Sequence, residues 1–393
     1  MKYIIGIIGL IVVLGLAWIT STDKKKVKYR PIIIMIILQF ILGFILLNTG
    51  VGNVLIGGIA NGFELLLKCA AEGVNFVFGG LVNDNQFTFF ISVLLPIVFI
   101  SALIGILQHW KILPFIVKYL GLALSKINGM GKLESYNGVA AAILGQSEVF
   151  ISVKKELGLL PEHRLYTLCA SAMSTVSMSI VGSYMVLLKP RYVVTALVLN
   201  LFGGFIISSI INPYTVTAEE DILVIQEEKK QSFFEMLGEY IMDGFKVAII
   251  VGAMLIGFVA IIAMINMAFK GVFGISFQNL LGYVFSPFAI LMGVPFKEAI
   301  PAASIMATKL VSNEFVAMTN LATCNIHLSA RTTAIVSVFL VSFANFSSIG
   351  IIAGAVKGLN EKQGNVVARF GLKLLFGATL VSILTATVVG LIV

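Results

Sequence analysis

Two glutamates lie in strongly apolar stretches of this chain, and small polar residues follow both of them at one distance. Glu148 ends the segment Ile143-Leu-Gly-Gln-Ser-Glu, and Glu314 lies in Val311-Ser-Asn-Glu-Phe-Val. Ser179 comes 31 residues after the first glutamate, and Asn345 comes 31 residues after the second. A carboxylate inside a hydrocarbon layer costs about 3 kcal/mol on insertion scales, so it marks a pathway or a binding site. The repeated spacing predicts a transport site.

The polar groups near these glutamates suit a neutral ligand that combines hydroxyls with a flat ring. Gln146 offers an amide that donates and accepts hydrogen bonds, and Ser147 offers a hydroxyl. Asn345 and Ser348 are three residues apart, so a helical turn would place both on one face, beside the ring of Phe343. We expect no fixed cation in this site, which disfavours an anionic ligand.

Single polar residues in membrane helices have a simpler explanation, since a lone Gln or Ser there most often mediates packing between helices. The paired pattern around Glu148 and Glu314 favours a functional role over that explanation. Glu298 is different, because a lysine and a proline next to it indicate a membrane interface. We therefore leave Glu298 out of the predicted site.

The composition is typical of a polytopic membrane protein. Of 393 residues, 59% are hydrophobic and 12% are charged, whereas soluble proteins carry about 25% charged residues. The formal net charge of +8 does not indicate nucleic-acid binding, because membrane proteins gather Lys and Arg in cytoplasmic loops. The cysteines and histidines show no metal, disulfide or catalytic spacing. We therefore expect no cofactor, no metal site and no enzymatic activity.

Apolar stretches of about 20 residues predict eight membrane-crossing helices. If the basic segment Lys24–Arg30 is cytoplasmic, alternation of the crossings places most other Lys-rich connections on the same side. This predicts both termini outside, an external segment at 50–87 and a cytoplasmic loop at 213–242. At the end of that loop, Ser232-Phe-Phe-Glu235 predicts a capping box that starts a helix. The eight predicted helices span 3–20, 31–49, 88–108, 164–188, 192–212, 243–268, 330–356 and 368–392.

Two further apolar regions, 134–160 and 286–325, are too long or too polar for a single crossing. We interpret them as re-entrant hairpins, since non-helical tips are tolerated in a membrane only where protein or a water-filled cavity surrounds them. The order helix, hairpin, broken helix, helix then occurs at 88–212 and again, inverted, at 243–393. Inverted repeats with broken helices at the midplane are typical of secondary transporters. The predicted fold is an all-α polytopic membrane protein with eight transmembrane helices and two hairpins, to which residues 1–87 add a scaffold.

These motifs resemble the concentrative nucleoside transporter family, in its bacterial nucleoside-permease branch. The resemblance spans nearly the whole chain and is densest at Gly145–Glu148, Leu310–Ala317 and Ser342–Gly350, with further similarity at Ser286–Pro295. It implies a nucleoside importer of the bacterial plasma membrane that forms a homotrimer within the lipid bilayer. Each protomer would combine a scaffold with a moving transport part. The resemblance favours pyrimidine nucleosides such as uridine and cytidine and leaves adenosine open as an alternative.

The same resemblance implies roles for single residues. Gln146 and Ser147 match positions that recognise the base, and Glu148 follows them in the same hairpin. The positions of Glu314 and, in the broken helix, Asn345 and Ser348 match ribose-binding residues. Phe343 matches an aromatic residue of that site.

One departure from the family pattern bears on the coupling ion. Sodium-coupled members carry an Asn five residues before the hairpin Gln, whereas this chain has Ala141, which offers no side-chain oxygen. Ser179 and Ile180 match other sodium-ligating positions, and Ile180 could offer only its carbonyl. Because a hard cation needs several oxygens, the missing ligand favours proton coupling over sodium. Burial favours the protonated form of a carboxyl, and the sequence does not choose between Glu148 and Glu314 as proton carrier.

Other functions fit the sequence less well. A sodium-coupled nucleoside symporter is the main alternative, with water or substrate groups in place of the missing ligand. A membrane enzyme acting on a nucleoside-linked lipid would need a metal or phosphate-binding cluster, and no such motif occurs. A channel would not require two hairpins with opposed acids, which suit alternating access.

Overall fold

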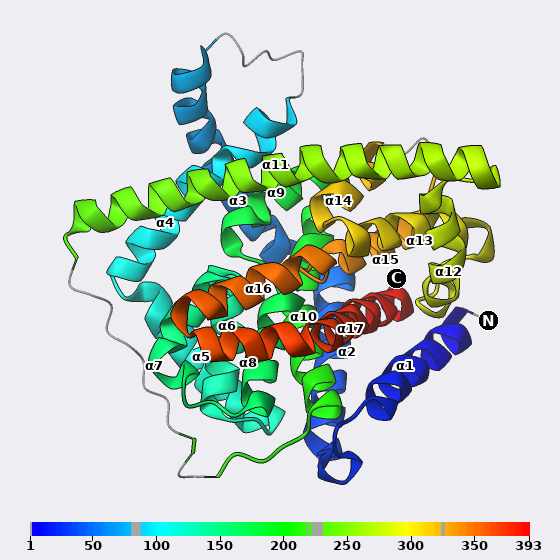
Figure 1. Cartoon of the computed structure of the whole chain (residues 1–393), viewed down its shortest axis with the longest axis horizontal. Helices are drawn as coiled ribbons and strands as arrows, with labels where there is room; N and C mark the ends of the chain where they lie inside the picture. The colour runs from blue at the N-terminus through cyan, green and yellow to red at the C-terminus, as the bar shows by residue number, and fades with distance from the viewer. Residues whose placement is uncertain (1, 80–87, 218–219, 222–230, 324–326) are drawn as a thin grey trace.

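A computed structural model describes residues 2–79, 88–217, 220–221, 231–323 and 327–393 of the chain (Figure 1). Within these ranges the regular structure is helical, without any strand. Seven of the described helices are long and apolar enough to cross a membrane, or up to eight if a bent helix pair counts as one span. The predicted class, an all-α polytopic membrane protein, is confirmed.

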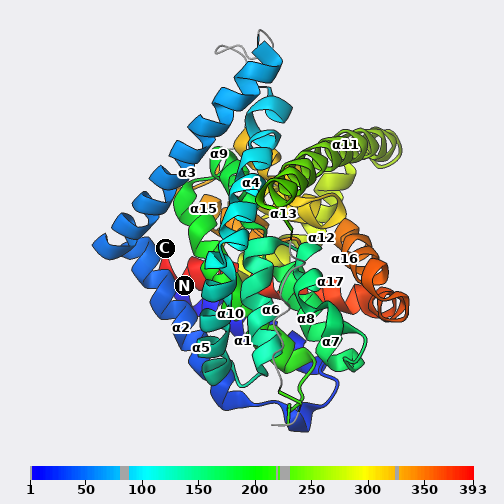
Figure 2. The same cartoon turned by 90° about the vertical axis from the view of Figure 1, so that its left-hand side faces the viewer.

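The N-terminal part contains a long helix that the sequence prediction placed in an external segment. Residues 50–87 were expected to form an external connection. The described part of this range is instead largely helical, and the helix is long and apolar enough to cross a membrane. Its glycines, asparagines and charges lower its hydropathy, although Lys68 and Glu64 compensate each other in an ion pair of 2.7 Å. In Figure 2 the last two helices of this part run along one edge of the molecule. The elements are α1 (Lys2–Ile19), η1 (Lys24–Lys26), α2 (Tyr29–Asn48) and α3 (Gly50–Phe78).

Two copies of one order of elements follow, and each includes a short helix that the sequence prediction did not contain. Each copy has a long helix, a short helix, a hairpin of two arms, a broken helix and a final helix. The first copy contains η3 (Phe90–Leu94), α4 (Pro96–His109), α5 (Ile112–Asn128), α6 (Lys132–Leu144), η4 (Glu148–Val153), α7 (Lys154–Leu157), α8 (Glu162–Ser174), α9 (Met178–Leu187) and α10 (Pro190–Ile211). The second contains α11 (Phe233–Phe273), α12 (Phe277–Leu291), α13 (Phe296–Val311), α14 (Glu314–Thr323), α15 (Ala330–Leu340), α16 (Phe346–Leu359) and α17 (Glu361–Ile392).

Helix α11 is longer than the predicted span 243–268. It begins at Phe233, where Ser232 and Glu235 form the predicted capping box by accepting hydrogen bonds from each other's backbone. Figure 1 shows this helix, in yellow-green, lying across the upper part of the molecule, where it packs against α4. The two helices that open the repeats are therefore neighbours in space.

The ranges predicted for the two hairpins coincide only in part with the ends of helices. The first, predicted at 134–160, has α6 as one arm and the short helices η4 and α7 as the other. The second, predicted at 286–325, begins only at Phe296, because Ser286 lies inside α12. Helices α12 and α13 meet at an angle of 116°. How deep the two hairpins lie in a membrane stays a prediction.

Helices α8, α10 and α17 form the centre of the molecule, and the side chains of α17 are mostly buried against them and α15. The start of α1 also packs on the end of α17, since a Cβ at Gly6 would lie 2.5 Å from the side chain of Leu391. Both ends of the described chain therefore lie on the same side of the fold. Which side of the membrane this is stays a prediction.

Candidate functional site

Glu314, at the start of α14, is held by two hydrogen-bond donors. The Tyr184 hydroxyl donates to Oε1 at 2.9 Å, and the Asn345 amide nitrogen donates to Oε2 at 3.0 Å. The glutamate is 5% exposed, so these donors replace water that its carboxylate would otherwise bind. Tyr184 lies on α9 of the first repeat, whereas Asn345 belongs to the second. The cluster therefore joins the two repeats through one carboxylate.

Asn345 serves two purposes at the start of α16. Its Oδ1 accepts hydrogen bonds from the Ser348 backbone N at 2.9 Å and the Ser347 hydroxyl at 2.7 Å, which caps the start of α16. Its amide nitrogen remains available for Glu314, because an Asn side chain carries an acceptor and donors at once. The fold thus orients the second half of the broken helix and the glutamate with one side chain.

Ser348 and Phe343 lie beside this cluster, as the sequence predicted. Ser348 is 1% exposed, and its hydroxyl oxygen has no hydrogen-bond partner among the described residues. Phe343 lies in the break between α15 and α16, where its backbone N donates to the carbonyl of Thr175 at 3.2 Å. Thr175 lies in the break between α8 and α9. The two broken helices therefore meet at their breaks.

The tip of the first hairpin is built around Gly145. Its φ of +112° lies in the region that favours glycine, and a Cβ there would approach Oε2 of Glu148 and Cβ of Ser177 to 3.0 Å. Gln146 and Ser147 are half-buried, whereas Glu148 is exposed. The Gln146 side-chain oxygen is buried and has no partner among the described residues.

The broken helix of the first repeat closes the end of α6. Ser177 donates to the carbonyl of Leu144 at 3.1 Å and shares a hydrogen bond of 2.7 Å with Ser179. Ser177 also caps α9, as Asn345 caps α16. The equivalent cap therefore follows Glu148 by 29 residues, not by the 31 that pointed to Ser179. Ser179 is still buried next to the cap, but the equal spacing did not mark equivalent positions.

The predicted residues fall into two groups. Hydrogen bonds join Glu314, Asn345 and the backbone of Ser348 directly. Element η4, which begins at Glu148, contacts α16, so the first hairpin adjoins this group. In the described ranges, however, no hydrogen bond links the side chains of Gln146, Ser147 or Glu148 to it.

Sequence reasoning missed a buried cation in the second hairpin. Lys309, on α13, is 0% exposed and donates to the carbonyl of Phe339 at 2.6 Å and to the hydroxyls of Ser342 and Ser382 at 2.6 and 3.2 Å. The sequence analysis expected no fixed cation and did not anticipate this lysine, although its hydrogen bonds go to residues outside the predicted site. A lysine in an apolar helix five residues before Glu314 was a visible signal. Tyr184 gave no comparable signal, because its contact with Glu314 spans 130 residues.

The donors for a coupling ion are limited. Ala141 is fully buried on α6 and offers no side-chain oxygen, as the sequence implied. In the part of the chain that the structure describes, no three His, Cys, Asp or Glu side chains are grouped to hold a metal ion. In the first repeat, hydrogen bonds bring together three oxygens, the carbonyl of Leu144 and the hydroxyls of Ser177 and Ser179.

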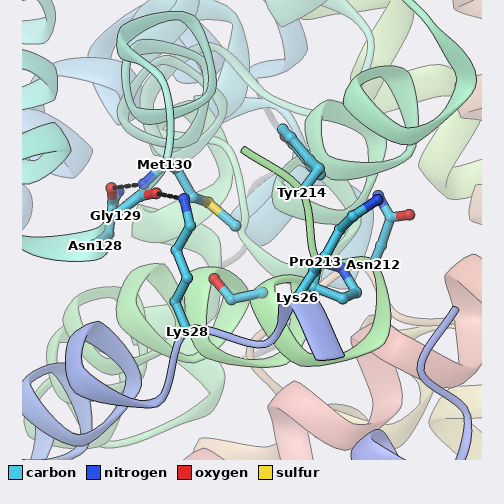
Figure 3. Close-up of a pocket in the computed structure, with 9 residues that line it drawn as sticks. Lys26, Lys28, Asn128, Gly129, Met130, Asn212, Pro213 and Tyr214 are labelled. Carbon is cyan, nitrogen blue, oxygen red and sulfur yellow. Dashed lines mark hydrogen bonds between the residues drawn. The ribbon is translucent and has the colours of Figure 1, made fainter. Parts of the chain in front are cut away.

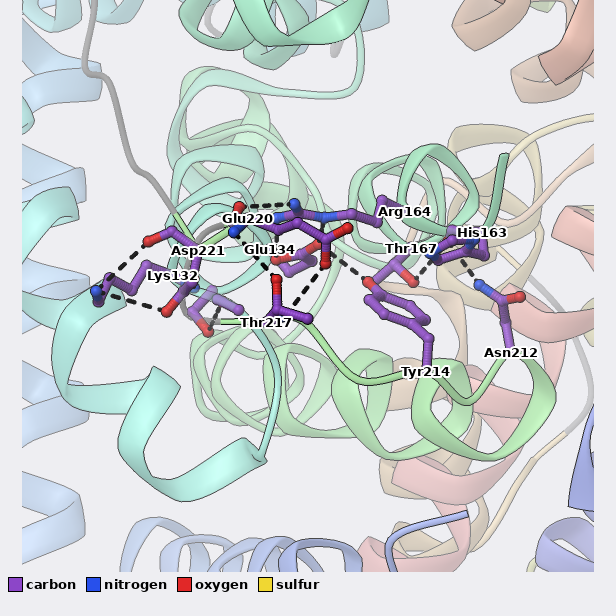
Figure 4. A network of polar contacts seen from close by, with 12 residues as sticks. Lys132, Glu134, His163, Arg164, Thr167, Asn212, Tyr214, Thr217, Glu220 and Asp221 are labelled. Atoms are coloured by element: carbon purple, nitrogen blue, oxygen red, sulfur yellow. Dashed lines mark hydrogen bonds and ion pairs between the residues drawn. The ribbon is translucent and has the colours of Figure 1, made fainter. Parts of the chain in front are cut away.

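A second network of polar contacts lies apart from the predicted residues and ties Tyr214 and Glu220 to the start of the first hairpin (Figure 4). Arg164, on α8, donates to both carboxylate oxygens of Glu134 on α6, at 2.5 and 3.1 Å, and to the carbonyl of Glu220. Tyr214 donates to the same glutamate at 3.1 Å. Burial, and the charge of Glu134 beside it, raise the pKa of Tyr214, which therefore stays a neutral donor. We assign this network a structural role.

A small cleft with two lysines also lies away from the predicted site (Figure 3). Lys28 donates to the carbonyl of Gly129 at 3.1 Å, and Lys26 pairs with Asp23 at 3.3 Å. Both cations are thus engaged by the protein itself. The cleft contains none of the predicted binding residues.

Comparison with known proteins gives one consistent result. Family models match the chain in sequence, as "Na+ dependent nucleoside transporter N-terminus" at 8–81, "Nucleoside recognition" at 90–191 and "Na+ dependent nucleoside transporter C-terminus" at 192–390. The purine nucleoside transport protein NupG of Bacillus subtilis is 37% identical over the full length of both chains. The chain belongs to the concentrative nucleoside transporter family. It is therefore a multi-pass membrane transporter and not an enzyme, as the sequence predicted.

Other members of the concentrative nucleoside transporter family support the fold over its whole length. The nucleoside permease NupC of Helicobacter pylori is 28% identical, with 99% of this chain and 97% of that protein covered. CNTnw in an inward-facing substrate-bound state has a TM-score of 0.94 and 30% identity, covering 100% of this chain and 99% of that one. A doubly substituted CNTnw in an outward-facing state also has a TM-score of 0.94, covering 100% of this chain and 98% of that one.

Proposed function

We propose that this transporter imports nucleosides into a bacterial cell by proton symport, with uridine and cytidine among its preferred substrates. It would act as a homotrimer in the plasma membrane, with both termini outside. The observation that carries the proposal is the buried cluster of Glu314, Asn345 and Ser348 at the point where the two broken helices meet. This cluster suits the hydroxyls of a ribose.

The argument for ribose rests on the hydrogen-bonding capacity that the protein leaves unused. A carboxylate offers about four acceptor positions, and Tyr184 and Asn345 use two of those on Glu314. The remaining positions can accept bonds from two neighbouring hydroxyls of one sugar. The hydroxyl of Ser348 is buried without a partner among the described residues, which is costly unless a ligand or water bonds to it.

Recognition of the base is assigned to the first hairpin. The amide of Gln146 has a buried oxygen without a protein partner, and Ser147 is adjacent to it. An amide and a hydroxyl can match the mixed donors and acceptors on the edge of a heterocycle. Phe343, in the break before Asn345, supplies an apolar ring next to the cluster of Glu314, Asn345 and Ser348. The name of the Bacillus subtilis relative makes purine nucleosides the second candidate class.

Proton coupling is supported by the residue at position 141 and by the contrast between the two glutamates. Ala141 removes an oxygen that a sodium cage would use. Tyr184 and Asn345 engage the Glu314 carboxylate, whereas Glu148 has no side-chain donor among the described residues. We therefore favour Glu148 as the group that takes up and releases the proton. Sodium coupling is the alternative, favoured by the description of the family models and by the oxygens around Ser179.

Uptake into proteoliposomes tests the proposal. Labelled uridine should accumulate when the outside is acidic and sodium is absent, because a proton gradient would then drive entry. Accumulation driven only by a sodium gradient at constant pH would contradict proton coupling. Preloading with unlabelled uridine should accelerate labelled uptake, which distinguishes a carrier from a channel.

Competition by unlabelled uridine, cytidine, adenosine and guanosine measures the base preference directly. Stronger inhibition by the two purine nucleosides would replace the pyrimidine assignment. The mass of the purified detergent-solubilised protein, corrected for bound detergent, tests the trimer.

A further inference from the structure

Lys309 is a fully buried lysine that the proposed transport cycle leaves without a role. It lies on α13, the first arm of the second hairpin, and is 0% exposed. A buried ammonium loses its hydration, and lysines are almost never fully buried unless the protein compensates them. Its burial in the arm that leads to Glu314 therefore requires specific partners that replace the lost hydration of the ammonium.

Those partners are three oxygens from two other elements. The ammonium of Lys309 donates to the carbonyl of Phe339 and to the hydroxyls of Ser342 and Ser382. An ammonium carries three donors and no acceptor, so these contacts satisfy all of them. The ring of Phe339 also lies 4.7 Å from the nitrogen, in reach of a cation–π interaction. A carbonyl and two hydroxyls are also ligands that suit a free monovalent cation, but here the cation is tethered to the hairpin.

The oxygens that hold Lys309 belong to the segment that positions the sugar-binding cluster. Phe339 is the second-last residue of α15, and Ser342 lies in the break that follows. Three residues after Ser342, Asn345 caps α16 and donates to Glu314. The backbone of a break lacks the regular bonds of a helix, so side-chain contacts must fix its course. Lys309 supplies such a contact, and Ser382 on α17 anchors it from the other side.

We propose that Lys309 is a positioning residue, whose tethered ammonium fixes the α15–α16 break so that Asn345 and Glu314 can bind the sugar hydroxyls together. The inference rests on the proposed function and deepens it. Lys309 bonds Ser342, three residues of backbone lead from Ser342 to Asn345, and Asn345 bonds Glu314, which lies five residues after Lys309 in the same hairpin. Lys309 also attracts the Glu314 carboxylate through space.

The test compares Lys309→Met with Glu314→Gln and with the double variant in proteoliposomes. Methionine keeps the length and apolar character of the lysine stem, and Ser342 and Ser382 can still bond each other across 2.9 Å. Lys297→Met, at the exposed start of the same helix, is the matched control. The readouts are the KM and the maximal rate of uptake for uridine and for 3′-deoxyuridine.

We expect Lys309→Met to raise the KM for uridine roughly tenfold, the change that follows the loss of a charge-assisted hydrogen bond. The KM for 3′-deoxyuridine should change less, so the preference for the complete ribose shrinks. The double variant should be no worse than Glu314→Gln alone, because both residues act on one contact to the sugar. The control should match the wild type in all readouts.

Three outcomes would overturn the inference. The first is an unchanged ratio of the two KM values in Lys309→Met, with only a lower maximal rate, since that is the mark of a purely structural lysine. The second is a double variant whose effect is the product of the single effects. The third is a wild type with equal KM for uridine and 3′-deoxyuridine, because the cluster would then not recognise the sugar hydroxyls. A wild type that transports no nucleoside at all would instead reject the proposed function.

If Lys309→Met does not reach the membrane, Ser382→Ala provides the same test in a milder form. It removes one of the three acceptors of the ammonium and leaves the lysine in place. We expect a change of a few-fold in the ratio of the two KM values, in the same direction. An unchanged ratio in this variant would count against the inference.

Discussion

The two hairpins occupy corresponding places in the repeats but carry opposite kinds of polar chemistry. In the second, Glu314 is buried, both of its oxygens have donors, and Lys309 lies in the arm before it. In the first, Glu148 is exposed, and the residue five positions before it is Ile143, whereas the residue five positions before Glu314 is Lys309. An inverted repeat thus duplicates the course of the backbone without duplicating the chemistry.

This difference has a physical reason and a functional consequence. A buried charge must be compensated by the protein, and the compensating bonds hold it in one position. The second hairpin therefore presents a preorganised acceptor, which suits recognition of a sugar. A carboxylate with few protein contacts can gain and lose a proton at a smaller structural cost. The first hairpin is accordingly the better place for a group that titrates during transport.

Of the substitutions that test this difference between the hairpins, Glu314→Gln should have the largest effect on uptake. The new amide would place its own donors opposite the amide of Asn345 or the hydroxyl of Tyr184, so a buried donor loses its acceptor. We expect uptake of uridine, as kcat/KM, to fall about 100-fold. Initial rates in proteoliposomes measure it, with Glu72→Gln on the exposed surface of α3 as the control. A fall of less than about threefold would remove the second hairpin from the binding site.

Glu148→Gln should separate transport from its driving force. Without a group that titrates, the carrier should still exchange internal for external uridine but should no longer accumulate it in an acidic medium. The measurement is counterflow beside proton-driven uptake, with Glu162→Gln at the exposed start of α8 as the control. The opposite result would reverse the roles of the two hairpins. In that case Glu148→Gln would still accumulate uridine, whereas Glu314→Gln would exchange uridine but no longer accumulate it.

Tyr184→Phe tests whether preorganisation of Glu314 depends on the first repeat. The change removes the hydroxyl that donates to Oε1 of Glu314 at 2.9 Å and leaves the Asn345 donor in place. Losing one hydrogen bond to a charged group should raise the KM for uridine roughly tenfold. Tyr166→Phe removes a buried hydroxyl that donates to a backbone carbonyl elsewhere and is the control. Equal effects of the two substitutions would show that the Tyr184 contact has no special role.

Gly145→Ala should give the smallest of these effects and tests the tip of the first hairpin. An alanine at φ +112° is strained by about 1–3 kcal/mol, and its Cβ would crowd Glu148 and Ser177. We expect the midpoint of thermal unfolding to fall by a few degrees and uptake to fall a few-fold. Gly238→Ala, in the helical part of α11 with open space around it, should be neutral or stabilising. Unchanged unfolding in Gly145→Ala would mean that the tip is not a fixed turn.

Much of the fold followed from local patterns. The helical class and the capping box at Ser232 and Glu235 could be predicted, because apolar length and cap chemistry act within a few residues. Helix α3 was missed because its polar residues lower its hydropathy, although a helix can accommodate them on one face. The range predicted for the second hairpin begins inside α12, although Gly293 and Pro295 mark the bend between α12 and α13 in the sequence.

The candidate site divides in the same way. Glu314, Asn345 and Ser348 were predicted together, and the structure joins them by hydrogen bonds. Ser177 was missed, because equal spacing pointed to Ser179, whereas the helix cap lies two residues earlier. Small differences in the length of a break cannot be seen in spacing alone.

The sequence alone determined which side chains could do chemistry and the kind of element that carries each of them. Only the tertiary structure decided which of them act together, because Tyr184, Lys309 and Ser382 come to the breaks from helices far away in the chain. A membrane interior enforces such contacts, since a buried charge or hydroxyl must find a partner wherever the fold can supply one. The sequence placed two acids in apolar surroundings, and the fold fixed one of them in place and left the other without a side-chain donor in the described residues.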